Sequence, residues 1–215
     1  MINFFPRLIT GILYIFILSS SILYSSKSFT IVMTILAILS TYESHSLWKR
    51  IKSNNPKYFP IPQTYVFFSI ATLFLTPFYF DKAYNPFSIL LIFVLIWICD
   101  TMSYFFGSLF GKNKMRIKVS PNKTWEGFFG GFFCSITFSF ISFMYIQEIY
   151  PFWKTILLGI FIPIFGLFGD IYQSKLKRMA GVKDSGNILP GHGGILDRLD
   201  SAMGASYISL IITII

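Results

Sequence analysis

The residues that could do chemistry are concentrated in one polar stretch, residues 169–200, which lies between two hydrophobic segments. Asp170 ends a long apolar run. Ser174, Lys177 and Arg178 follow it at positions i+4, i+7 and i+8, so a continuing helix would carry all four side chains on one face. A carboxylate followed by a hydroxyl and two cations suits the joint binding of a metal ion and phosphate.

Two further carboxylates, Asp197 and Asp200, stand near the end of this stretch. Their i, i+3 spacing places them on the same side of a helix. Mg²⁺ accepts carboxylate oxygens as ligands, with phosphate oxygens and water completing its shell. The Pro-Gly-His-Gly-Gly turn at residues 190–194, which precedes Asp197, cannot be a helix interior. Its backbone N–H groups could cradle phosphate. We therefore expect a magnesium site formed by Asp170, Asp197 and Asp200.

The run from Ser174 to Asp200 resembles the signature of the phosphatidate cytidylyltransferases, also called CDP-diacylglycerol synthases. The resemblance implies an enzyme of phospholipid biosynthesis that transfers the CMP moiety of CTP to phosphatidate, giving CDP-diacylglycerol and pyrophosphate. It implies Mg²⁺ as the cofactor, alone or with a second cation. The matching positions, which contain no gaps, are Ser174, Lys177-Arg178, Lys183-Asp184, Gly186, Pro190, His192-Gly193-Gly194, Asp197-Arg198 and Asp200.

The candidate catalytic residues follow from this stretch and from the resemblance. The cations among them would bind phosphates, and Arg suits bidentate phosphate contact because its guanidinium is a planar fork. His192 either contacts phosphate or has a structural role in the glycine-rich turn. The full set is Asp170, Ser174, Lys177, Arg178, Lys183, Asp184, His192 and Arg198.

A second polar cluster, residues 111–127, contains five cations and Glu126. It is either a basic anchor between two membrane spans or a clamp for triphosphate or lipid phosphate, with residues 120–124 as a rigid turn. Its Ser-Pro-x-Lys-Thr-Trp-Glu-Gly run also resembles the second conserved block of the same family. The candidate substrate-binding residues are Lys112, Ser120, Lys123 and Thr124, together with Asp100.

Asp100 lies inside an apolar segment, where a carboxylate costs roughly 2.5–3.5 kcal/mol on insertion scales. It either bonds a neighbouring helix or faces a polar cavity, and the resemblance favours the cavity. Tyr42-Glu43 resembles an aromatic–glutamate pair of the family. Two positions depart from the family pattern: Gln173 replaces a common acidic residue, and Ser108 replaces a common Arg. Either departure would weaken a phosphate or metal contact.

The composition predicts the elements that must position these residues. The chain has 215 residues, of which 54% are hydrophobic and 13% charged, about half the charge of a soluble domain. We expect an all-α, polytopic membrane bundle that forms a single domain over residues 1–215, with its catalytic part over about 100–215. The last span has about 17 residues, the low end for crossing a bilayer. The seven expected spans are residues 7–25, 28–48, 62–80, 86–110, 125–147, 151–173 with an extension to 180, and 199–215.

The distribution of positive charge predicts the topology. With the N-terminus inside, fifteen Lys and Arg residues lie in inside segments and three lie outside, as the positive-inside rule requires. The polar stretch then faces the cytoplasm, where nucleotide is found, and we expect a bacterial inner membrane location. The net charge of +9 therefore does not indicate nucleic-acid binding. The expected partners are CTP, phosphatidate and membrane lipid, and the question of a homodimer stays open.

Two other classes of protein fit the sequence less well. CDP-alcohol phosphotransferases also act on activated lipid, but their different spacing of helical aspartates is not found here. A transporter or channel could use carboxylates to bind a cation. Against transport, the polar residues cluster at one membrane face, and the sequence shows no paired broken helices at mid-membrane.

Overall fold

The computed structural model describes residues 4–54, 61–79, 83–189 and 193–215. These residues form seven α-helices, so the all-α class is confirmed, and every hydrophobic segment expected from the sequence corresponds to one helix. A short 3-10 helix, η1 (Thr76–Phe78), continues the third helix. The α-helices are α1 (Phe4–Tyr24), α2 (Ser26–Asn54), α3 (Ile61–Leu75), α4 (Pro86–Phe110), α5 (Trp125–Ile146), α6 (Phe152–Met179) and α7 (Leu196–Ile214).

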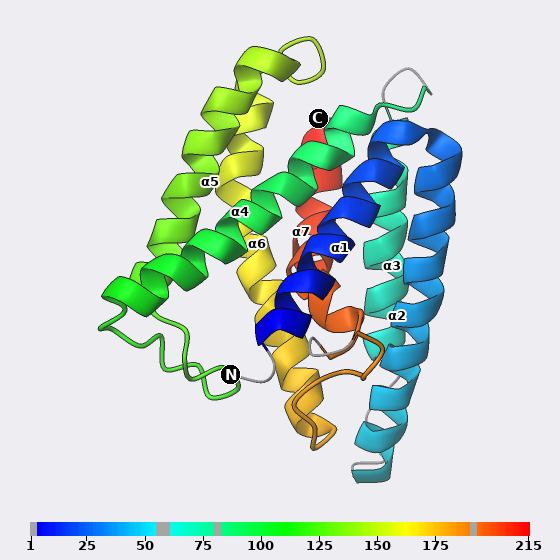
Figure 1. Cartoon of the computed structure of the whole chain (residues 1–215), viewed down its shortest axis with the longest axis vertical. Helices are drawn as coiled ribbons and strands as arrows, with labels where there is room; N and C mark the ends of the chain where they lie inside the picture. The colour runs from blue at the N-terminus through cyan, green and yellow to red at the C-terminus, as the bar shows by residue number, and fades with distance from the viewer. Residues whose placement is uncertain (1–3, 55–60, 80–82, 190–192) are drawn as a thin grey trace.

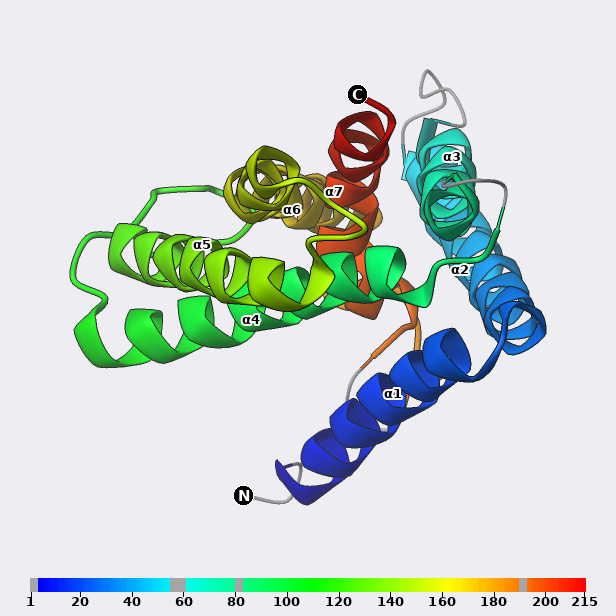
Figure 2. The same ribbon diagram turned by 90° about the horizontal axis from the view of Figure 1, so that it is seen from above.

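The helices form two groups with α7 between them, as the view from above shows (Figure 2). Helices α4, α5 and α6 pack together on one side, and α1, α2 and α3 lie on the other (Figures 1 and 2). Helix α7 contacts α6 and α4 in the first group and α2 and α3 in the second. The helix that carries Asp197 and Asp200 is therefore the central element of the bundle.

Local sequence explains where the helices around the site begin. Asn85 caps α4 by accepting a hydrogen bond from the backbone N–H of Phe87 at 3.1 Å, and Pro86 occupies the first turn. Thr124 caps α5 in the same way, since its hydroxyl oxygen accepts from the N–H of Gly127 at 3.2 Å. The start of α5 is thus set directly after the polar loop that follows α4.

Close packing of α6 and α7 depends on two glycines, Gly169 and Gly204. A Cβ atom added to Gly169 would overlap the backbone carbonyl of Asp200 and lie 2.7 Å from the Cα atom of Gly204. The two helices can approach this closely only because neither carries a side chain at the crossing. This contact brings Asp170 on α6 beside Asp200 on α7.

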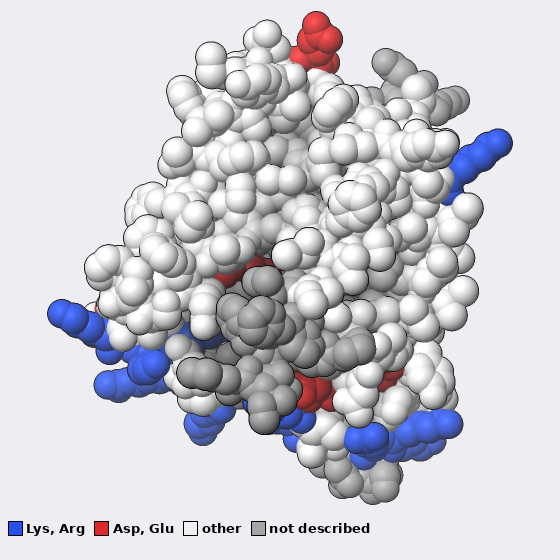
Figure 3. Space-filling model, viewed as in Figure 1, with Lys and Arg blue, Asp and Glu red and all other residues white. Residues whose placement is uncertain are grey.

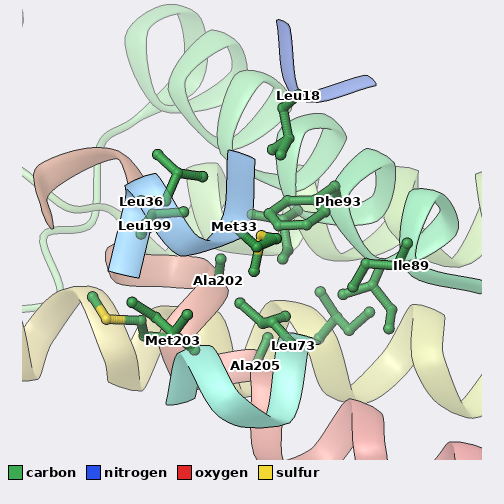
Figure 4. Packing of buried hydrophobic residues seen from close by; sticks show 14 of the residues in the cluster. Leu18, Met33, Leu36, Leu73, Ile89, Phe93, Leu199, Ala202, Met203 and Ala205 are labelled. Carbon is green, nitrogen blue, oxygen red and sulfur yellow. The ribbon is translucent and has the colours of Figure 1, made fainter. Parts of the chain in front are cut away.

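The hydrophobic core joins α7 to the N-terminal helices. Figure 4 shows Leu18 of α1, Met33 of α2, Leu73 of α3, Phe93 of α4 and Met203 of α7 in one cluster. Each of these side chains is at most 2% exposed. One face of α7 is therefore buried against α2, α3 and α4, which fixes the rotation of the helix and the direction of its acidic face.

Three helices, α4, α5 and α6, are long and apolar enough to cross a membrane, and residues 9–24 and 63–78 form two shorter apolar helical stretches. Large apolar side chains such as Phe16, Phe133 and Met144 are exposed on the outside of the bundle. The membrane character expected from composition is thus supported by three candidate spans. The count of seven spans stays a prediction.

Charged side chains gather at one end of the bundle. In Figure 3, Lys and Arg side chains line the lower edge of the molecule, where Figure 1 places the ends of α2 and α6 and the loop between α4 and α5. Most of the face above this edge is uncharged, and acidic atoms show in a recess just above the basic edge. The molecule therefore has one strongly polar end.

Candidate active site

A cavity of about 490 Å³ lies between α4, α5, α6, α7 and the loop that joins α4 to α5. Its walls combine apolar side chains, such as Ile96, Phe128 and Ile162, with acidic and basic ones. The cavity therefore offers an apolar surface and an ionic surface side by side. The charged residues that border it are Asp100, Lys123, Asp170, Asp197, Arg198 and Asp200.

Three carboxylates reach this cavity from three different helices: Asp100 from α4, Asp170 from α6 and Asp200 from α7. Asp200 lies near enough to both of the others to interact with them electrostatically. Ser201 bonds two of them, because its hydroxyl donates to Asp100 Oδ1 at 3.3 Å and its N–H donates to Asp200 Oδ1 at 2.8 Å. The three carboxyl groups form one acidic centre in the cavity.

Lys123 supplies a positive charge to this centre from the loop between α4 and α5. Its ammonium group forms an ion pair with Asp170 Oδ2, and the hydroxyl of Ser174 donates to Asp170 Oδ1 at 3.3 Å. Ser120 and Thr124 of the same loop also border the cavity. The loop between α4 and α5 thus contributes a cation and two hydroxyl-bearing residues to the cavity lining.

The donor set at this centre fits a hard divalent cation. Mg²⁺ is usually held by one or two carboxylates, with water and substrate phosphate oxygens completing an octahedron. Within residues 4–54, 61–79, 83–189 and 193–215, no three acidic, His or Cys side chains already converge as ligands of one ion. The arrangement is therefore suited to a cation shared between protein carboxylates and a bound phosphate, and it does not resemble a closed structural metal site.

Asp197 differs from the other carboxylates because its oxygens are occupied by donors from α6 and from the loop between α6 and α7. Lys177 donates to Oδ1 at 2.6 Å, while the N–H of Ser185 at 2.8 Å and the N–H of Gly194 at 3.0 Å donate to Oδ2. Burial alone would raise the pKa of Asp197, but Lys177 and the two N–H groups outweigh it and hold that pKa below its ordinary value. Asp197 therefore stays ionised and fastens the loop between α6 and α7.

The structure brings some of the predicted site residues together and leaves others apart. Ser174 and Lys177 do not border the cavity in the described part of the chain, but each bonds a carboxylate that does. Arg178 is exposed and donates to the carbonyl of Val182 at 3.0 Å. Lys112, Lys183 and Asp184 are exposed and lie away from the cavity lining, and His192 lies outside the described residues.

Glu43 of α2 is a functional candidate to which sequence analysis gave no role. Its side chain is buried, at 2% exposure, and bonds the backbone at the start of α7. The available signal was a glutamate within a mostly apolar segment, because a buried carboxylate persists only where donors surround it. Its partners could not be identified from spacing, since they lie about 150 positions further along the chain.

These features define a class of protein: an all-helical membrane chain that gathers carboxylates and cations in one cavity at the polar end of its bundle, a centre suited to phosphate chemistry. The chain belongs to the cytidylyltransferase family, whose sequence model matches residues 61–215. This match confirms the resemblance of residues 174–200 to the signature of the family. Glu43 lies before the matched region.

Several bacterial proteins named phosphatidate cytidylyltransferase are similar to the chain. That of Staphylococcus epidermidis (strain ATCC 35984) is 50% identical over 115 residues, which cover 54% of this chain and 44% of that protein. Those of Staphylococcus haemolyticus and Staphylococcus aureus (strain COL) are 46% identical over 126 residues, or 59% of this chain and 48% of each relative. The matched segment thus spans somewhat less than half the length of these relatives.

Proposed function

We propose that this chain provides the catalytic centre of a phosphatidate cytidylyltransferase, with CTP and phosphatidate as substrates and CDP-diacylglycerol and pyrophosphate as products. The observation that carries the proposal is the meeting of Asp100, Asp170 and Asp200 in one cavity with Lys123 and Arg198. Family membership and the names of the relatives point to the same reaction.

The reaction explains why such a cavity is needed. An oxygen of the phosphatidate phosphate attacks the α-phosphorus of CTP, a new P–O bond forms, and the bond to the β-phosphate breaks to release pyrophosphate. Both partners are anions, so cationic groups must offset their repulsion and hold them in line. Phosphatidate is already ionised near neutral pH, so the attack requires no general base.

The carboxylates of the cavity would hold the metal. From the sequence we proposed three metal ligands, Asp170, Asp197 and Asp200. The geometry supports Asp170 and Asp200 most strongly, and Asp100 lies beside them on the cavity. Bound there, Mg²⁺ would neutralise phosphate charge and polarise the α-phosphoryl group. Asp197 borders the same cavity, but it would have to give up a loop hydrogen bond to join the ligand set.

The phosphate contacts would come from two segments. Lys123, Arg198, Ser120 and Thr124 all border the cavity, and the two hydroxyl groups would donate hydrogen bonds to phosphate oxygens. Among the remaining candidates, Lys177 is already paired with Asp197, so we assign it the role of holding that carboxylate in place. The exposed cations would act at the rim, where the triphosphate enters: Lys112, Arg178 and Lys183.

We further propose that the polar end faces the cytoplasm of a bacterial cell and that all seven helices are membrane spans. The concentration of Lys and Arg at that end in Figure 3 supports this orientation. The apolar wall of the cavity, which includes Ile96, Phe128 and Ile162, suits the glycerolipid part of phosphatidate.

The decisive test is pyrophosphate release by the purified chain in detergent–lipid micelles. We expect pyrophosphate release to require CTP, phosphatidate and Mg²⁺ together. We also expect it to fall at least a hundredfold in Asp200→Asn. A well-folded chain that releases no pyrophosphate, or an Asp200→Asn variant with full activity, would contradict the assignment. A liposome flux assay on the same preparation separates catalysis from ion transport.

A further inference from the structure

Glu43 occupies a position in the bundle that no other acidic residue of the described chain shares. It lies on α2, and its carboxylate accepts hydrogen bonds from the backbone at the start of α7. The N–H of Ile195 donates to Oε1 at 3.1 Å, and the N–H of Leu196 donates to Oε2 at 2.9 Å. Ile195 has no capping oxygen of its own, so a side chain from a distant helix supplies the cap of α7.

The loop between α6 and α7 is shaped around this carboxylate. A Cβ atom added to either Gly186 or Gly194 would overlap an oxygen of Glu43. The two glycines therefore let the loop backbone pass against the carboxylate on two sides. An added methyl group at either glycine would therefore force the Glu43 carboxylate to shift away from the loop.

Ser185 joins Glu43 to the carboxylate that fastens the other side of the loop. Its hydroxyl oxygen lies 3.0 Å from Glu43 Oε2 and 2.9 Å from Asp197 Oδ2, and its single proton can bond one of them at a time. Asp197 in turn is paired with Lys177 of α6. A continuous set of contacts thus runs from α2 through the loop to α7 and α6.

We propose that Glu43 is a positioning residue of the transfer reaction, which acts by fixing the start of α7 so that Arg198 and Asp200 face the cavity. The proposal rests on the proposed function. Glu43 is not among the described residues that border the cavity, so it acts through the backbone of α7 and through Ser185. A charged acceptor strengthens these bonds and favours the positive end of the helix dipole.

This assignment gives the N-terminal helices a part in the reaction. The described residues of the signature lie on α6, the following loop and α7, but the start of α7 is held from α2. Loss of the Glu43 charge should therefore disturb the site without removing any group that touches substrate.

The test compares Glu43→Gln with Glu148→Gln, the same change at an exposed glutamate between α5 and α6. The Gln amide would turn an NH₂ group toward backbone donors, so at least one N–H at the start of α7 would lose its acceptor. We expect kcat for pyrophosphate release to fall about tenfold to hundredfold with KM for CTP within about twofold, as for other supporting residues of metal sites. Glu148→Gln should match the wild type.

Amide hydrogen exchange gives a readout that does not depend on turnover. Peptides covering residues 193–203 should exchange faster in Glu43→Gln, and peptides from α4 and α5 should not change. Unaltered exchange at the start of α7, or an equal fall of kcat in both glutamine variants, would overturn the proposal. If the wild type shows no turnover, the proposed function fails, while the exchange comparison still decides whether Glu43 fixes α7.

Ser185→Ala provides a second variant of milder effect, because it removes one of the three donors to Glu43. It should lower kcat several-fold, and the double variant with Glu43→Gln should lose less than the product of the two single losses. Losses that multiply fully would show that the two residues act independently, against the proposal. Ser185→Ala also carries the test if Glu43→Gln fails to accumulate.

Discussion

The crossing of α6 and α7 should tolerate an added methyl group at Gly166 but not at Gly169. A Cβ atom at Gly166 would lie 3.5 Å from Ser201, an ordinary packing distance. At Gly169 it would lie 2.7 Å from the Cα of Gly204, about 1 Å inside the 3.5–4.0 Å at which carbon atoms pack best. The helices would have to separate, and Asp170 and Asp200 would move apart with them.

The size of the stability loss follows from a comparison of two identical substitutions one turn apart on α6. Gly→Ala raises helix propensity by about 0.5–1 kcal/mol at either position, so that gain cancels between Gly166→Ala and Gly169→Ala. Overpacking costs typically about 1–3 kcal/mol and applies to Gly169→Ala alone. For a chain of this size, the difference corresponds to about 2–12 °C in Tm.

Thermal unfolding in detergent and pyrophosphate release measure the two consequences. Gly169→Ala should unfold at a lower temperature than Gly166→Ala and should lose on the order of a hundredfold in turnover, the cost of a displacement near 1 Å at a reacting centre. Equal Tm values for the two variants, or full turnover by Gly169→Ala, would refute the argument that the α6–α7 contact sets the spacing of the carboxylates.

Three further predictions concern charges at the site. Asp200→Asn should lower kcat at least a hundredfold and raise the Mg²⁺ concentration needed for half-maximal rate, and an unchanged Mg²⁺ response would move the metal elsewhere. Lys123→Met should lower turnover about tenfold or more, because it removes the cation paired with Asp170. Lys112→Met, at an exposed position, should lower turnover less and change mainly KM for CTP. Equal losses of turnover in the two variants would argue against a specific role for Lys123. Arg178→Lys should raise KM for CTP several-fold if the planar guanidinium binds phosphate, and unaltered CTP kinetics would remove Arg178 from the site.

The sequence predicted the helices well because their determinants are local. The expected span 86–110 coincides with α4, where Asn85 and Pro86 mark the start. Thr124 likewise sets the start of α5 within its own turn. Apolar run length and capping residues act over a few positions, so they can be recognised without knowledge of the tertiary structure.

The two interpretations of Asp100 show where sequence reasoning reached its limit. The sequence was compatible with a structural hydrogen bond for Asp100 and with a place on a polar cavity. The structure shows both features, because Asp100 borders the cavity and accepts a hydrogen bond from Ser201. Asp197 was predicted as a metal ligand from its spacing to Asp200. Its bonds to Lys177 and Gly194 depend on how the loop folds back, which spacing does not determine.

By itself the sequence determined the helical class, the concentration of charge at one end and the set of candidate residues for metal and phosphate binding, since these depend on composition and on neighbours along the chain. Only the tertiary structure decided which carboxylates meet. That choice depends on the close approach of α6 and α7 at Gly169 and on the cap that Glu43 supplies to α7 from 153 positions away. Contacts between distant segments form only when packing brings the helices together, so no local pattern encodes them.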